Sequence, residues 1–138
     1  MGNVFKVFDS VVEEELALKL LSSKGNVSKD FLTREFEILS RLNHPNLVKV
    51  HNLGFTSDDT PFFTMDLIEG INIKRFFEKH SNDSYLQIVL RSILSALNYL
   101  HTKEIYHSDI KPDNILISND PSTDIHVTLL DFGLAVNK

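Results

Sequence analysis

The sequence predicts an α+β fold in two parts, on three observations. Residues 4–67 hold short runs with apolar residues at every second position, around one segment of helical periodicity. Residues 73–101 are mostly helical in pattern, and two apolar runs at 115–117 and 125–130 then predict a hairpin. An antiparallel sheet with one helix is therefore expected first, and a mostly helical part after a boundary at 67–70.

Composition narrows the class of protein. The chain has 138 residues, enough for one modest domain with a sizeable core. It has no cysteine, which excludes disulfides, zinc–thiolate sites and a thiol nucleophile, and fits an intracellular (cytoplasmic) protein. Its net charge of −5 argues against nucleic acid as a partner, and no apolar run reaches membrane-spanning length.

The helix and strands expected in residues 4–67 follow from the spacing of apolar residues and from residues that end helices. Strands are expected at 4–9 and 16–21, with Ala17 and Lys19 on the same face of the second. A helix is expected over 28–42, with Ser28 as its N-cap, and His44-Pro45-Asn46 ends it. Strands at 47–53 and 61–67 then flank a polar turn.

Glu35 stands out because it falls inside the apolar stripe of that helix. A buried carboxylate needs a cation or several hydrogen-bond donors, and Lys19 is the nearest candidate in the sequence. The alternative is that Glu35 lies at the edge of the stripe and reaches water. The helix pattern does not choose between the two.

The second part is predicted to hold helices at 73–79 and 85–101. The buried stripe expected on the longer helix consists of Leu86, Val89, Ile93, Ala96, Leu97 and Leu100. The strands of the hairpin join through a turn at 119–122. Between helix and hairpin lies a polar loop, 106–114, which contains Asp109, Lys111 and Asn114; Asp131 follows the hairpin. Carboxylates, an amide and an ammonium together suit a polyanion bound with a divalent cation.

Several motifs in order resemble those of eukaryotic-type (serine/threonine) protein kinases. The strongest are His107-Ser108-Asp109 with Lys111 and Asn114, and Asp131-Phe132-Gly133. Supporting ones are Ala17-Leu18-Lys19, Glu35, His44-Pro45-Asn46 and Met65-Asp66-Leu67. The resemblance implies a bilobal fold. Residues 1–66 would form an N-lobe sheet plus helix that lacks its first strand, and 67–138 a partial helical C-lobe with hinge, catalytic loop and Asp-Phe-Gly triplet.

The resemblance also implies roles for individual residues. Asp109 would accept the proton of a substrate hydroxyl, and Lys111 would neutralise the transferred phosphoryl group. Asn114 and Asp131 would bind Mg²⁺, while Lys19, paired with Glu35, would contact the phosphates of ATP. His107 would be structural rather than catalytic. The remaining residues expected around the nucleotide are Val4, Ala17, Met65, Asp66, Leu67, Leu116 and Leu130.

The sequence departs from the family pattern in two respects. Ser108 stands where many kinases carry the arginine that pairs with a phosphorylated activation loop, so control by such phosphorylation is not expected. Elements before Gly2 and after Lys138 in the family pattern are missing from this sequence. On that basis the isolated chain is expected to be marginally stable, to expose apolar surface on the helix at 85–101, and to have little or no kinase activity.

Three functions therefore compete. The first is Mg-ATP-dependent phosphoryl transfer to serine or threonine hydroxyls of a protein substrate. The second is a non-catalytic kinase-like module that binds ATP or a partner protein. The third is a small-molecule phosphotransferase of related fold, which Lys111 and the Asp131-Phe132-Gly133-Leu134-Ala135 run disfavour.

Overall fold

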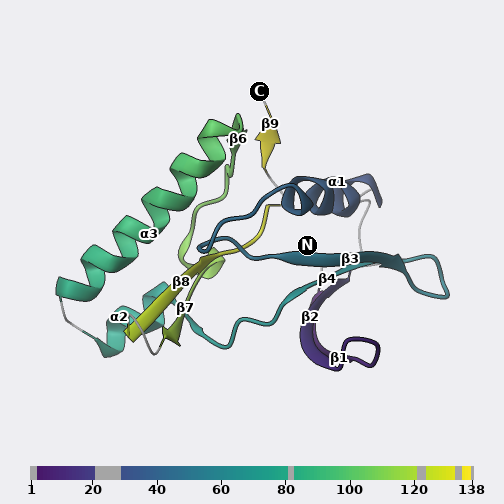
Figure 1. Ribbon diagram of the computed structural model, residues 1–138, viewed down its shortest axis with the longest axis horizontal. Coiled ribbons are helices and arrows are strands. Elements are labelled where there is room, and N and C mark those ends of the chain that lie inside the picture. The colour runs from purple at the N-terminus through teal and green to yellow at the C-terminus, as the bar shows by residue number, and fades with distance from the viewer. Residues whose placement is uncertain (1–2, 21–28, 81–82, 121–123, 133–134, 138) are drawn as a thin grey trace. The chain divides into compact units, whose positions relative to one another are not determined.

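The computed structural model describes residues 3–20, 29–80, 83–120, 124–132 and 135–137 (Figure 1). The chain forms two compact units. Unit 1 consists of Met1–Asn43 and Lys49–Leu67, and unit 2 of His44–Val48 and Ile68–Lys138. The division into functional lobes at residues 66 and 67 stays a prediction.

Unit 1 is built on a four-stranded antiparallel sheet with strand order β1-β2-β4-β3. The strands are β1 (Asn3–Asp9), β2 (Glu14–Leu20), β3 (Val50–Phe55) and β4 (Pro61–Asp66). All four were predicted from alternation. The prediction for β3 was wrong at its start, because Leu47 and Val48 pair with unit 2 instead.

One helix, α1 (Lys29–Ser40), packs on β3 and β4. Its Phe36 ring lies 5.9 Å from that of Phe63, which is fully buried. The helix ends two residues before the predicted Leu42, and the predicted cap Ser28 lies outside the described residues. The core of the unit consists of Leu16, Ala17, Leu32, Ile38, Leu39, Leu42, Val50 and Phe63.

Unit 2 contains a three-stranded sheet with strand order β5-β7-β8. The predicted hairpin is present as β7 (Ile115–Asp120) and β8 (Asp124–Leu129). The third strand, β5 (Ile71–Asn72), was not predicted because two residues carry no readable period. Gly70 precedes it, and a Cβ there would lie 2.6 Å from the Ile117 carbonyl oxygen, so only glycine lets the chain approach β7 this closely.

The helices of unit 2 are α2 (Ile73–Lys79), α3 (Asp83–Thr102) and the short 3₁₀ helix η1 (Pro112–Asn114). The bounds of α2 are those predicted from the sequence. Asn72 caps it, because its Oδ1 accepts a hydrogen bond from the Arg75 N–H at 2.9 Å. Two further short strands, β6 (Ile105–Tyr106) and β9 (Val136–Asn137), pair with each other and were not predicted.

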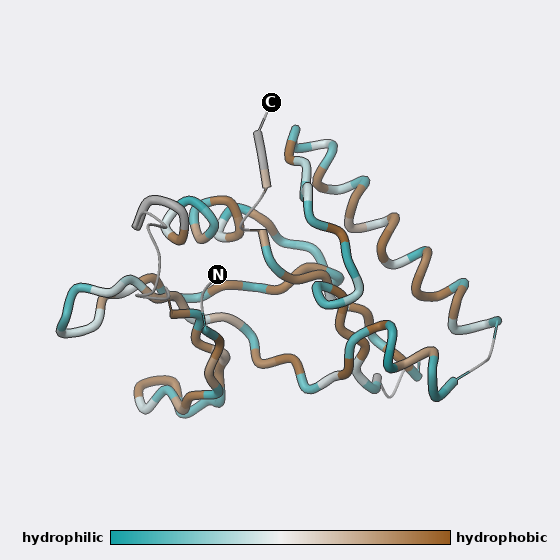
Figure 2. The backbone as a smooth tube through the Cα atoms, turned by 180° about the vertical axis from the view of Figure 1, so that it is seen from behind, coloured by the Kyte–Doolittle hydropathy of each residue, from teal (hydrophilic) through white to brown (hydrophobic). Residues whose placement is uncertain are grey.

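One face of α3 packs against β8 and β6, and brown and teal stretches alternate along the helix in Figure 2. Val89, Ala96 and Leu100 of the predicted stripe are fully buried. The prediction that Leu86 is buried was wrong, since it is 45% exposed. Leu90 and Leu94, one and two turns further on, are also exposed, so α3 carries a second apolar face open to solvent. Among the described residues, no helix combines the length and the hydrophobicity that crossing a membrane requires.

The segment His44–Val48 lies along β8 and is joined to it by an isolated bridge and by hydrogen bonds. Leu47 forms a parallel bridge with Leu129, and the Val48 N–H donates to the Leu129 carbonyl at 3.2 Å. The Leu129 N–H in turn donates to the Asn46 carbonyl at 2.9 Å, and Asn46 Nδ2 donates to the Val127 carbonyl at 2.8 Å. Because β8 ends the sheet on this side, these contacts cover its edge and hold the strand that leads to Asp131.

Candidate functional site

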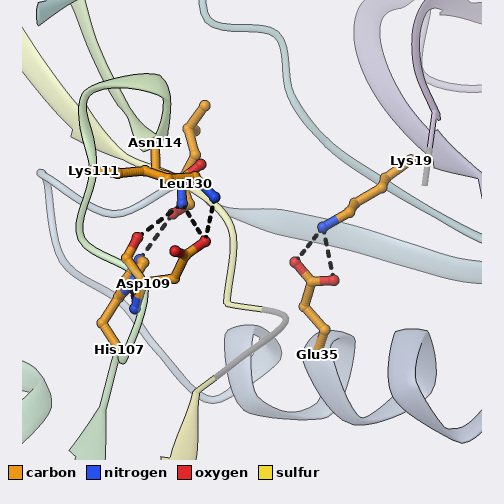
Figure 3. A network of polar contacts seen from close by, with 7 residues as sticks. All are labelled: Lys19, Glu35, His107, Asp109, Lys111, Asn114 and Leu130. Carbon is orange, nitrogen blue, oxygen red and sulfur yellow. Dashed lines mark hydrogen bonds and ion pairs between the residues drawn. The ribbon is translucent and has the colours of Figure 1, made fainter. Parts of the chain in front are cut away.

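Unit 1 contains a buried ion pair between the sheet and its helix (Figure 3). The Lys19 Nζ on β2 lies 2.6 Å and 2.8 Å from the two carboxylate oxygens of Glu35 on α1. Glu35 is 4% exposed, so the alternative that it reaches water is wrong. Desolvating two charges is costly unless both are well paired, and here both carboxylate oxygens accept from the ammonium.

The sheet register places other predicted nucleotide residues on the face that Lys19 shares. Directly paired residues of antiparallel strands point to the same side. Val4 pairs with Lys19, and Ala17, two residues before Lys19, pairs with Met65. Ala17 is buried, Met65 is half-buried and Val4 is 57% exposed, which gives that face an apolar surface beside one ammonium.

Asp66 lies on the opposite face of the sheet, and Leu67 lies beyond the end of β4. Asp66 alternates with Met65, and its Oδ1 lies 2.7 Å from Nε2 of His51 on β3. Leu67 follows the last residue of β4 and is half-buried. The pairing with His51 was not predicted, and an isolated histidine in a strand gives no sequence signal for it.

In unit 2, His107 anchors the polar loop. It is 2% exposed, and its Nε2 donates to the Leu130 carbonyl at 2.8 Å. Its Nδ1 accepts from the Asp109 N–H at 3.3 Å, and its ring packs 4.6 Å from that of Phe132. Burial lowers the pKa of His107, so the imidazole is neutral, with the proton on Nε2. Both ring nitrogens hold backbone groups, which makes this residue a support for Asp109 rather than a base.

Two side chains of the loop, Lys111 and Asn114, meet at Asp109 (Figure 3). Its Oδ2 accepts from Lys111 Nζ at 2.7 Å and from Asn114 Nδ2 at 3.0 Å. Asn114 Nδ2 also donates to the Asp109 backbone carbonyl at 2.9 Å. The hydrogen bond from Lys111 lowers the pKa of Asp109 and raises the pKa of Lys111, so both groups are charged at neutral pH.

The turn η1 brings Asn114 back to Asp109. Pro112 opens it, with the fixed φ that suits a first helical position, and the Asn114 N–H donates to the Lys111 carbonyl at 3.0 Å. The Leu130 N–H then donates to the Asn114 carbonyl at 2.8 Å. The main chain at Leu130 thus holds both ends of the loop, His107 and Asn114.

Asp131 follows Leu130 directly and belongs to the same cluster. Its negative charge opposes the lowering of the Asp109 pKa and supports the raising of the Lys111 pKa, so it acts on both groups. Asp131 has φ 58° and Ser108 has φ 64°, in the left-handed region that residues with side chains rarely adopt. Such conformations concentrate at functional sites, where the surrounding contacts maintain them.

The donor set suits a hard cation held partly by phosphate. In the part of the chain that the structure describes, no group of three or more His, Cys, Asp or Glu residues is arranged to hold a metal ion, so a cage made of such side chains alone has no support there. Mg²⁺ is commonly held by one or two protein oxygens together with phosphate oxygens and water. The Asp131 carboxylate and the Asn114 amide oxygen fit that pattern, since the Asn114 amide nitrogen is already engaged with Asp109.

Comparison with known families gives a match over the whole chain. The family model described as "Protein kinase domain" matches residues 1–138. The chain belongs to the protein kinase domain family. In this kinase chain the motif residues Lys111 and Asn114 hydrogen-bond Asp109, and Asp131 acts on Asp109 and Lys111 through its charge.

Several of its curated relatives are named as serine/threonine-protein kinases. The kinase chain is 35% identical to the probable serine/threonine-protein kinase fhkA of Dictyostelium discoideum, over 97% of this chain and 24% of that protein. It is 35% identical to the serine/threonine-protein kinase RAD53 of Saccharomyces cerevisiae, over 97% of this chain and 16% of that protein. The chain thus spans less than half the length of the curated relatives described.

Solved structures support the same fold. A crystal structure of the Rad53 kinase domain and SCD2 matches with a TM-score of 0.80 and 29% identity, over 99% of this chain and 51% of that one. The predicted α+β, protein kinase-like fold is therefore confirmed.

A bacterial relative is also named as a serine/threonine-protein kinase. PrkC of Bacillus subtilis is 34% identical over 98% of this chain and 21% of that protein.

Two predicted nucleotide residues of unit 2 remain to be placed. Leu130 takes part in the cluster through its backbone alone, and its side chain is half-buried. Leu116 lies on β7, paired with Thr128, and is half-buried. The backbone hydrogen bonds of Leu130 to His107 and Asn114 could not be predicted from the sequence, because they do not depend on its side chain.

Proposed function

We propose that the protein transfers the γ-phosphoryl group of Mg-ATP to serine or threonine hydroxyls of a protein substrate. Membership of the family and the names of the relatives support this reaction. The observation that carries the proposal is the state of Asp109. Its carboxylate is ionised, partly accessible, and held through Oδ2 by Lys111 and Asn114.

Asp109 Oδ1 would receive the substrate hydroxyl. Oδ2 carries the contacts to Lys111 and Asn114, which orient the carboxylate and direct Oδ1 to an incoming donor. The lowered pKa makes Asp109 a weak base. That suits a reaction whose transition state is loose, in which orientation of the hydroxyl matters more than early proton removal.

Lys111 would supply positive charge to the transferring phosphoryl group. Its ammonium already neutralises Asp109 at 2.7 Å, and it could share its protons with a phosphoryl oxygen.

ATP and Mg²⁺ are the proposed cofactors. Asn114 and Asp131 would hold the Mg²⁺, whose charge screens the phosphates, and Lys19, oriented by Glu35, would contact phosphate oxygens. The apolar residues proposed around the adenosine are Val4, Ala17, Met65, Leu67, Leu116 and Leu130, with backbone groups at Asp66 and Leu67 on the adenine edge.

Transfer of labelled phosphate from ATP to serine- and threonine-containing peptides tests the proposal. Asp109→Asn keeps the size of the side chain but removes the charge, and we expect a loss of roughly 10²- to 10⁴-fold in rate. Asp113→Asn is the matched control, because Asp113 is an exposed acid four residues along the same loop. Equal rates for Asp109→Asn and the unsubstituted protein would rule out the proposed role. Transfer to sugars or amines but not to peptides would favour a small-molecule phosphotransferase, and ATP binding without turnover a non-catalytic module.

Two further predictions belong to this proposal. An intracellular location is expected, in keeping with the absence of cysteine. Regulation by a phosphorylated loop is not expected through Ser108, whose hydroxyl donates to the Tyr106 carbonyl at 3.3 Å and carries no positive charge.

A further inference from the structure

A side-chain contact joins β3 to the end of β4 in unit 1. His51 Nε2 and Asp66 Oδ1 are 2.7 Å apart, and the two side chains are 28% and 45% exposed. Asp66 is the last residue of β4, and residues 67–70 have no regular secondary structure. The contact therefore lies where the chain leaves the sheet.

The pairing of the two strands is irregular at this end. The register of β3 against β4 shifts between Val50 and Leu53. The Asn52 N–H donates to the Thr64 hydroxyl at 3.2 Å, a side-chain acceptor in place of a ladder carbonyl. A register shift of this kind disrupts the ladder of backbone hydrogen bonds locally.

Asp66 is linked by its backbone to the residue that precedes β3 and by its side chain to β3 itself. Its N–H donates to the Lys49 carbonyl at 2.9 Å, and its carboxylate meets His51. One link fixes the peptide before Asp66, and the other fixes the side chain that branches from its Cα. Together they restrict the main chain at Asp66, from which Leu67 continues.

We propose that His51 is a positioning residue for the nucleotide base. Through Asp66 it holds the backbone of Asp66 and Leu67 in the orientation that binds the adenine edge, and so raises the affinity for ATP without touching it. This inference rests on the proposed function, in which those backbone groups bind the base. His51 itself contacts the side of β4 opposite to Met65, away from the face that carries Lys19.

The test compares ligands that contain the base with one that does not. Binding of ATP, adenosine and inorganic tripolyphosphate to the whole protein is measured with Mg²⁺ by competition against a fluorescent nucleotide. For His51→Ala we expect ATP and adenosine to bind about two- to five-fold more weakly, the range for a partly exposed pair, and tripolyphosphate to bind unchanged. His51→Gln, whose amide nitrogen can reach Asp66 Oδ1, should restore most of the affinity.

Thr60→Val is the matched control, since it removes a hydroxyl contact, Thr60 Oγ1 to Asp58 at 3.2 Å, at the other end of the same hairpin. It should leave all three affinities unchanged. The inference is overturned if His51→Ala binds ATP as the unsubstituted protein does, if tripolyphosphate weakens equally, or if His51→Gln fails to restore binding. Failure of the unsubstituted protein to bind any nucleotide overturns the proposed function as well, which separates the two claims.

Discussion

Burial and nearby polar groups determine whether an ionisable side chain in this protein is charged or neutral. Glu35 is ionisable and 4% exposed, and Lys19 supplies the compensating charge at 2.6 Å. His107 is 2% exposed, burial lowers its pKa so that the imidazole is neutral, and two backbone groups hydrogen-bond its ring nitrogens. The sequence pointed to Lys19 and Glu35 as partners, because a carboxylate interrupted an apolar stripe. It could not show that Leu130 and the Asp109 N–H hold His107, since these are main-chain groups distant in sequence.

Removing one charge of the buried pair is predicted to be more costly than removing both. Lys19→Met should lower the free energy of unfolding by about 3–5 kcal/mol, because Glu35 then keeps its charge or takes up a proton in an apolar environment. The double variant Lys19→Met with Glu35→Leu should regain most of the loss. Urea unfolding monitored by circular dichroism measures both. A double variant no more stable than Lys19→Met would contradict this account.

The pKa of His107 predicts how stability depends on pH. Burial holds the pKa of His107 in the folded protein below its ordinary 6.5, so the unfolded chain binds more protons as the pH falls through that value. The contribution of the neutral His107 to stability is therefore present above pH 6.5 and is lost as the pH falls through the folded pKa. His107→Phe should reduce this loss between about pH 7 and pH 5.

Urea midpoints of the two proteins across that window make the comparison. Some acid sensitivity should remain in His107→Phe, because burial also lowers the pKa of His44. The lowered pKa of Asp109 acts at lower pH, since its contribution is present above the ordinary 3.8 and is lost as the pH falls through the folded pKa. An unchanged slope in His107→Phe would mean that His107 is not buried and neutral.

Among the helices and strands, the period of apolar residues predicts only those that are long enough to show a period. The helix α2, the hairpin β7–β8 and the strands of unit 1 all came from period and from Gly, Pro and Asn breakers. The strands β5, β6 and β9 have two residues each, and their existence depends on partners far away in the chain.

The helix α3 shows another limit of prediction from the sequence. Its sequence supports two apolar faces, and the position of β8 rather than the period decides that Leu100 is buried and Leu94 is not.

The two faces of α3 predict opposite results for the same substitution. Leu100→Ala should cost about 2–5 kcal/mol of unfolding free energy, because it leaves a cavity at a fully buried position. Leu94→Ala, at a residue 64% exposed, should change it by less than about 0.5 kcal/mol. The pair is matched in chemistry and in helix, so denaturant unfolding isolates the effect of burial. Similar losses for both would show that the Leu94 face is covered.

At the scale of the whole molecule, the chain does not divide at a single point. His44–Val48 belongs to unit 2 although its neighbours on both sides belong to unit 1. The sequence predicted part of it as the start of a strand of the first sheet, because Leu47 and Val48 continue the apolar run of 47–53. Its actual partners, Val127 and Leu129, lie about eighty residues later, and only tertiary structure brings them together.

The polar loop was readable from the sequence because its chemistry depends on side chains. Asp109, Lys111 and Asn114 meet as their motif predicts, and their hydrogen bonds give each a defined orientation. The left-handed backbone at Ser108 and Asp131 was not readable, because neither residue is a glycine and the surrounding contacts impose the conformation.

Magnesium-dependent binding of ATP is the most direct test of the proposed Mg-ATP site. ATP is titrated into the whole protein by calorimetry, with Mg²⁺ and with a chelator, and the titrations are repeated on Asp131→Asn. We expect saturable binding that Mg²⁺ strengthens, and a loss of most of that strengthening in Asp131→Asn, because a carboxylate holds the cation better than an amide. No binding, or binding that is equally strong without Mg²⁺, would contradict it.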